Sequence, residues 1–86
     1  MKDIFIAITG VNIDFEMARS MAGIIARKES GDTDCLAWLD ARQGRQSPGG
    51  AQCEIKGRPG WEVYGENHGG RLRISLNDGE YVFIHS

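Results

Sequence analysis

The stretch from Arg71 to Ile84, RLRISLNDGEYVFI, decides how this chain folds. Two runs of alternating apolar residues flank Asn77-Asp78-Gly79, and an Asp-Gly pair between such runs is a strong signal for a β-hairpin. A two-residue turn at Asp78-Gly79 fixes the register, so that apolar side chains share one face of the sheet, which we predict to be the core. The predicted pairs are Leu76 with Tyr81, Ile74 with Phe83, and Leu72 with His85.

A second apolar run, IFIAI, occupies residues 4–8. Because it is continuously apolar, it is typical of a strand buried on both faces, and we expect it at the centre of the sheet. After Gly10 the sequence predicts a helix of about four turns, with Asn12 as its N-cap and Gly31 as its C-cap. One face of this helix carries apolar side chains at helical spacing: Phe15, Ala18, Met21, Ala22 and Ile25.

The middle of the chain has a strand pattern. We expect strands at residues 35–40, 51–56 and 61–65, and a loop at residues 42–50, RQGRQSPGG. Residues 57–60, GRPG, favour a tight turn that folds residues 61–65 back on residues 51–56. The predicted order is β-α-β-β-β-β-β, and the fold class is α+β, with one amphipathic helix packed on a mostly antiparallel sheet of five or six strands.

Length and composition fit one compact domain over residues 1–86. A chain of 86 residues with 41% hydrophobic and 26% charged residues has enough apolar surface for one core and not for two. No cationic leader precedes the first strand, and no apolar run approaches the ~20 residues of a membrane span, so we expect a cytoplasmic protein without a membrane partner.

One helix is too narrow to cover the predicted sheet. A helix is about 10 Å across, whereas five strands about 4.8 Å apart form a sheet about twice as wide. Unless the sheet curls around the helix, one face is left to pack on another copy or on a protein partner. The candidate interaction residues are Trp38, Leu36, Val82 and Ile84, with Arg71 and Arg73 beside them.

The alternative is a site for a small molecule. His68 lies between an asparagine and two glycines, where an imidazole can act as a general base or can equally belong to a tight turn. Basic residues outnumber acidic ones between residues 41 and 75, and the glycine-rich segment 42–50 carries two arginines, so the ligand is expected to be anionic. The candidate ligand-binding residues of this small anion-binding protein or enzyme are His68, Asp40, Arg42, Arg45, Trp61 and Tyr64.

Metal and nucleic-acid sites are disfavoured. Cys35, Cys53, His68 and His85 are chemically suitable zinc ligands, but no two of them have the short spacing of a zinc half-site. We therefore expect free thiols, no metal and no cofactor. Trp61 and Tyr64 would lie on opposite faces of one strand, which argues against a platform on which bases stack. No residue is assigned a catalytic role.

Several motifs of the chain occur together: Ala37-Trp38-Leu39-Asp40, Ser47-Pro48, Cys53, Gly60-Trp61-Glu62, Tyr64-Gly65, His68-Gly69-Gly70 and Tyr81-Val82-Phe83-Ile84. They resemble a small family of uncharacterised single-domain proteins from bacteria and archaea, and the resemblance covers residues 35–84. It implies a compact α/β sandwich with no established activity. The resemblance leaves the function open. From the uncovered sheet face and the arginines at its edge, we expect a non-catalytic interaction or regulatory module that self-associates or binds a protein partner.

Overall fold

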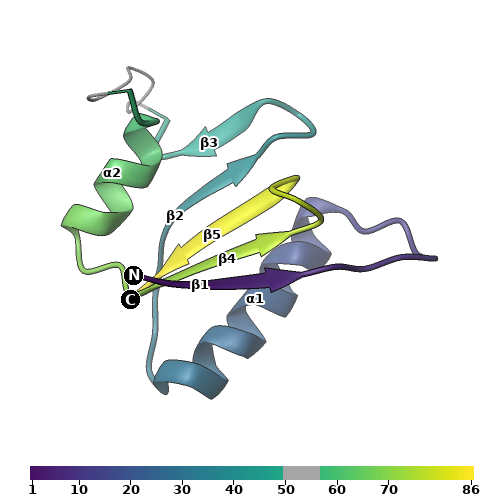
Figure 1. Cartoon of the computed structure of the whole chain (residues 1–86), viewed down its shortest axis with the longest axis horizontal. Helices are drawn as coiled ribbons and strands as arrows, with labels where there is room; N and C mark the ends of the chain where they lie inside the picture. Colours follow the sequence, from purple (N-terminus) through teal and green to yellow (C-terminus); the bar gives the residue numbers. More distant parts are fainter. Residues whose placement is uncertain (50–56) are drawn as a thin grey trace.

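The computed structural model of the chain describes residues 1–49 and 57–86 (Figure 1). Its fold class is α+β, as the sequence predicts, but the described residues form two helices where one was predicted. The strand predicted at residues 51–56 lies outside the described residues. The elements in chain order are β1 (Lys2–Ile6), α1 (Phe15–Ser30), β2 (Cys35–Asp40), β3 (Arg45–Ser47), α2 (Gly60–Asn67), β4 (Leu72–Leu76) and β5 (Tyr81–His85).

The five strands form one sheet in the order β1-β4-β5-β2-β3 (Figure 1). The sheet is mixed rather than mostly antiparallel, because β1 pairs with β4 in parallel while the other three pairs are antiparallel. The prediction that residues 4–8 form a central strand is wrong, since β1 lies at an edge. Ile4 and Ile6 pack against the core, whereas Phe5 lies on the opposite face of the strand and is exposed.

The β4–β5 hairpin has the predicted register. Its turn holds Asn77, Asp78 and Gly79 at φ of 51°, 57° and 86°, the left-handed region that these residue types tolerate best. All six side chains that the register places on one face are buried, which confirms this face as core. Asn77 also accepts a hydrogen bond on its Oδ1 from Ile8 N at 2.8 Å, so the turn holds the segment that follows β1.

Helix α1 packs on this core face. Its N-cap is Asp14 rather than the predicted Asn12, because the Asp14 carboxylate accepts a hydrogen bond from Met17 N at 2.8 Å; Gly31 is the C-cap, as predicted. Three buried alanines let the helix lie close to the sheet. Phe15 fills the space at the first turn, with its ring centroid 4.6 Å from that of Trp38. The alanines are Ala18, Ala22 and Ala26.

Helix α2 occupies the segment predicted as a strand at residues 61–65, so that prediction is wrong. Pro59 immediately precedes the helix in an extended conformation, a place where proline is tolerated at a helix start. Trp61 and Gly65 are four residues apart and therefore face the sheet together, where α2 packs chiefly on β2 and β5. Packing of the indole decides the conformation of a segment whose local pattern also fits a strand.

The two helices lie on opposite faces of the sheet. Side chains alternate along each strand, so α1 covers Phe83 while α2 covers its neighbours Val82 and Ile84. The loop predicted at residues 42–50 contains strand β3, which pairs with β2 at the edge opposite β1. Neither α1 nor α2 has the length and apolar character to cross a bilayer, and residues 1–49 and 57–86 hold no other helix.

Candidate functional site

One edge of β1 has no partner strand among the described residues. Lys2 donates its backbone N–H toward β4, and Ile6 accepts on its C=O from the residue that follows β4. Because backbone groups alternate along a strand, the N–H and C=O groups of Asp3 and Phe5 point away from the sheet. Ala7, the first residue beyond β1, continues the alternation, because the next residue, Ile8, again bonds through its N–H to Asn77. Such a row of backbone groups is a template for pairing with another extended chain.

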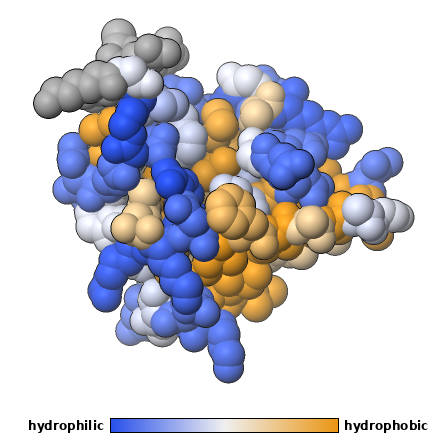
Figure 2. Space-filling view, viewed as in Figure 1, coloured by the Kyte–Doolittle hydropathy of each residue, from blue (hydrophilic) through white to orange (hydrophobic). Residues whose placement is uncertain are grey.

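Phe5 makes β1 apolar on the face of the sheet opposite α1. The Phe5 side chain is 77% exposed, because α2 covers β2 and β5 and leaves the part of the face near β1 open. A hollow of about 340 Å³ beside it includes Ala7, Thr9 and Ser75 in its lining. Figure 2 shows apolar surface gathered where β1 passes in front of α1 in Figure 1. Part of the sheet face near β1 is therefore uncovered, whereas Val82 and Ile84, which were predicted to lie on an uncovered face, are buried beneath α2.

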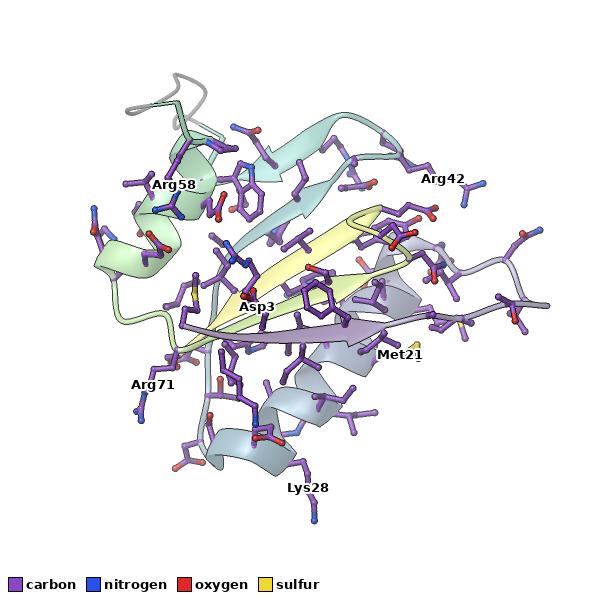
Figure 3. All side chains as sticks on the ribbon, in the orientation of Figure 1. Asp3, Met21, Lys28, Arg42, Arg58 and Arg71 are labelled. Carbon is purple, nitrogen blue, oxygen red and sulfur yellow. The ribbon has the colours of Figure 1, made fainter. Side chains whose placement is uncertain are left out.

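The candidate interaction residues from the sequence are divided between the two faces. Val82 and Ile84 are buried beneath α2, and Trp38 packs beneath α1. Leu36 is half-buried on β2. Arg71, just before β4, projects away from the rest of the molecule (Figure 3). The structure thus brings Val82 and Ile84 together and separates them from Trp38.

Arg73 belongs to a chain of ion pairs that ties α2 to the sheet. Its guanidinium pairs with Asp3 of β1 at 2.6 Å and with Glu62 of α2. Arg58 then pairs with Glu62 at 3.0 Å and with Glu66 at 2.7 Å. Hydrogen bonds from these arginines lower the pKa of both Asp3 and Glu66. These contacts fix the position of α2 over β4, whose side chains it otherwise contacts little.

Three of the candidate ligand residues, Asp40, Arg42 and Arg45, lie at the end of β2 and in the turn that follows it. Asp40 is fully buried and accepts hydrogen bonds from Gln43 N at 3.1 Å and from Arg45 Nη2 at 3.0 Å. Arg42 donates a hydrogen bond from Nη1 to Ile13 O at 3.2 Å. Asp40 therefore holds the turn between β2 and β3, and Arg42 ties this turn to the segment that precedes α1.

The other three candidates are all on α2 or at its end. Trp61 faces the sheet and is 5% exposed, whereas Tyr64 and His68 are exposed. His68 is the C-cap of α2; its ring stacks on Tyr64 at a centroid distance of 3.8 Å, and its Nδ1 donates to Tyr64 O at 2.8 Å. His68 thus closes the last turn of the helix.

The two groups of candidate ligand residues do not share one site. No hydrogen bond or ion pair joins the Asp40 group to the α2 group in the part of the chain that the structure describes. In Figure 3 Arg42 projects from one end of the molecule, and Arg58, just before α2, lies toward the other. Across residues 1–49 and 57–86, no three His, Cys, Asp or Glu side chains are placed to hold a metal ion.

Comparison with known proteins identifies the family of this chain. A family model described as Domain of unknown function (DUF5619) matches residues 1–85. The chain belongs to the DUF5619 family. This agrees with the resemblance to an uncharacterised family that the sequence motifs suggest.

The DUF5619 domain also has a solved structural neighbour. This is the crystal structure of AF1514 from Archeoglobus fulgidus DSM 4304, described as a novel non-family-model protein. The two chains are 30% identical, the match covers 100% of this chain and 93% of the other, and the TM-score is 0.82. No curated protein matches the chain.

Two features of this DUF5619 domain were missed by the sequence reasoning. Phe5 was assigned to a central strand because its run is continuously apolar; the charged pair Lys2-Asp3 at the start of β1 was the signal for an edge. Cys35 and His85 are register partners in the β2–β5 ladder. Their separation along the chain gives no sign of this contact, which depends on the strand order.

Proposed function

We propose that this domain is a protein-interaction module that self-associates by pairing the free edge of β1 with β1 of a second copy. The observation that carries the proposal is the outward row of backbone groups at Asp3, Phe5 and Ala7. The strand is apolar on both of its faces, with Ile4 and Ile6 on one and the exposed Phe5 on the other. Strand addition at such an edge is a common mode of protein recognition.

A second copy suits this edge because β1 is complementary to itself in one antiparallel register. With a two-fold axis at Phe5, Asp3 of one copy lies opposite Ala7 of the other, and Ile4 lies opposite Ile6. Apolar side chains then meet on both faces, and no like charges oppose each other. Shifting the register in one direction places Asp3 opposite Phe5 or opposite Asp3, which is less favourable. Shifting it in the other direction pairs Phe5 with Ala7 and Asp3 with Thr9, so more of the pairing falls beyond the end of β1.

The proposed interface is small, so the dimer should be weak and reversible. Pairing through one five-residue strand buries less than the roughly 1,200 Å² of a typical stable interface. We therefore expect a dimer that forms with rising protein concentration rather than an obligate one.

Sedimentation velocity over a range of protein concentrations tests the proposal. Phe5→Lys puts two charges at the two-fold axis, and Ala7→Pro removes an outward N–H while leaving the hydrogen bonds to β4 intact. Both variants should stay monomeric where the unaltered chain dimerises. Ile24→Lys is the matched control, because it also replaces an exposed apolar residue (60% exposed), and it lies on α1 away from β1.

Three results would contradict the proposal. The unaltered chain could remain monomeric at every concentration. Phe5→Lys and Ala7→Pro could both dimerise as the unaltered chain does. Ile24→Lys could abolish dimerisation while the β1 variants keep it, which would place the interface on α1.

A further inference from the structure

A cavity of about 430 Å³ lies between α1 and the sheet, at the end where β2 begins and β5 ends. Arg19 and Arg27 line it from α1, and Cys35 and His85 line it from the strands. None of these residues belongs to the β1 edge. The cavity is of the size that small ligands occupy in proteins, about 300–1,000 Å³.

The two arginines on the helix side have no carboxylate partner within the described ranges. Arg19 and Arg27 are two turns apart on one side of α1, with Gly23 between them. Arg27 Nη1 lies 3.4 Å from the place where a Cβ on Gly23 would stand, so the guanidinium folds back along the helix over the glycine. By contrast, four other arginines all form ion pairs: Arg42, Arg45, Arg58 and Arg73.

Gly23 is unfavourable as a helix residue, because glycine in a helix interior is less stable than alanine. The Arg27 guanidinium lies over this glycine at the cavity wall, and a Cβ there would stand 3.4 Å from Nη1, which is ordinary contact distance. The helix therefore gives up local stability at the position where two cations approach the cavity.

The strand side of the cavity presents a hydrogen-bond acceptor. Thr33 Oγ1 donates its one proton to Ser86 O at 2.9 Å, so it accepts from His85 Nδ1 at 3.2 Å. This fixes the neutral imidazole with its proton on Nδ1 and a lone pair on Nε2. Burial, together with the charge of Arg27, lowers the pKa of His85, which keeps the ring neutral near pH 7.

We propose that this cavity binds a small phosphate monoester whose organic part carries hydroxyl groups. The guanidiniums of Arg19 and Arg27 bind the phosphate oxygens, for which their planar donor geometry is well suited. His85 Nε2 accepts a hydrogen bond from a hydroxyl of the ligand. Glu16 and Asp34 also line the cavity, but both are exposed and neither forms an ion pair with Arg19 or Arg27, so the two guanidiniums remain available.

The probe is glycerol 3-phosphate, titrated into ¹⁵N-labelled protein and followed by NMR chemical shifts. We expect shifts to cluster at residues around the cavity, with glycerol giving none and inorganic phosphate binding more weakly. Arg27→Gln should weaken binding roughly tenfold or more, because a charge-assisted contact is lost. Lys28→Gln is the control, since it removes one charge from the same helix and the side chain projects away from the molecule (Figure 3).

A second variant separates the ligand contact from folding. Gly23→Ala should raise the melting temperature, because alanine favours the helix, and should leave binding within about twofold, because the new Cβ only reaches ordinary contact distance, 3.4 Å, from Arg27 Nη1. The proposal is overturned if glycerol 3-phosphate causes no shifts around the cavity at millimolar concentrations. It is also overturned if Arg27→Gln and Lys28→Gln weaken binding equally, which would indicate attraction to the general charge of the helix.

Discussion

The two helices pack on opposite faces of the same sheet through different kinds of contact. Helix α1 has sixteen residues and meets the sheet through a ridge of alanines with aromatic and aliphatic side chains around it. Helix α2 has eight residues and meets the sheet through one large side chain, Trp61, and through glycines that let its backbone approach Ile84. Ion pairs through Arg73 complete the α2 contact.

This difference shows that the α2 face depends on few contacts. On the α1 side many small apolar contacts share the stabilisation, so no single side chain provides most of it. On the α2 side the removal of Trp61 leaves a short helix with only glycine contacts and partly exposed ion pairs. We therefore expect α2 to open before the α1 face unfolds.

The largest expected effect comes from Trp61→Ala, which removes the main apolar contact of α2. Truncating a buried tryptophan typically costs about 3–5 kcal/mol. Native-state hydrogen exchange should show that the amides of α2 lose protection while those of α1 keep most of theirs. Equal loss of protection in both helices would show that the two faces unfold as one unit, so that α2 does not open before the α1 face.

Replacing a glycine by alanine should have a medium effect on the free energy of unfolding, and the effect should have opposite signs in the two helices. Gly65→Ala places a Cβ 2.9 Å from Ile84 Cδ1 and Cγ2, and such overpacking should lower the free energy of unfolding by about 1–3 kcal/mol. Gly23→Ala meets only the flexible end of Arg27, at 3.4 Å, and should stabilise α1 by roughly 0.4–1 kcal/mol. Urea denaturation measures both values.

The double variant Gly65→Ala/Ile84→Ala sharpens this comparison. Shortening Ile84 removes Cδ1 and Cγ2, the two atoms 2.9 Å from the new methyl group, so the two substitutions should together cost less than the sum of their separate effects. Strict additivity would mean that contact with Ile84 is not the reason for the glycine.

The smallest effect is a dependence of stability on pH that distinguishes the two faces. His85, on the α1 side, has its pKa lowered by burial from its ordinary value of 6.5. The unfolded chain therefore binds the proton first, and stability falls as the pH drops through 6.5 toward the pKa of the folded state. Glu66, on α2, has its pKa lowered from 4.5 by the hydrogen bond from Arg58, so its contribution to stability is present above pH 4.5 and is lost as the pH falls from 4.5 toward the pKa of the folded state.

Thermal unfolding between pH 7 and pH 5 measures this difference. In that window the unaltered chain should lose a little stability, and His85→Gln should show a flatter profile. Glu66→Gln should reproduce the slope of the unaltered chain, since the Glu66 carboxylate stays ionised throughout. A slope that His85→Gln leaves unchanged would assign the titration to another group.

The sequence predicts those parts of the fold that local chemistry decides. The β4–β5 register follows from Asp78-Gly79 and the alternation on each side, and α1 follows from its apolar periodicity and from Gly31. The N-cap of α1, Asp14, lies two residues after the predicted N-cap, Asn12. Both residue types are good N-caps, and the geometry of the chain after β1 decides which one caps the helix.

The features that the sequence does not predict depend on contacts between distant segments. The continuous apolar run IFIAI fits a central strand, but β4 and β5 lie inside the sheet and β1 lies at its edge. Residues 61–65 fit a strand locally, and the pocket for Trp61 on β2 and β5 makes them helical. The predicted site residues rest on residue type and loop position. Neither property indicates the face of the sheet on which a residue lies.

The parallel pairing of β1 with β4 has a consequence for a nascent chain on the ribosome. Lys2 pairs with Leu72, and α1 packs on side chains of the β4–β5 hairpin. Both β1 and α1 therefore leave the exit tunnel long before this hairpin has been synthesised. During that interval the IFIAI segment and the apolar side of α1 have no native surface to bury against. Chaperones that recognise short apolar stretches would meet the segment containing Phe5 first, and only synthesis of β4 and β5 would release it into the fold.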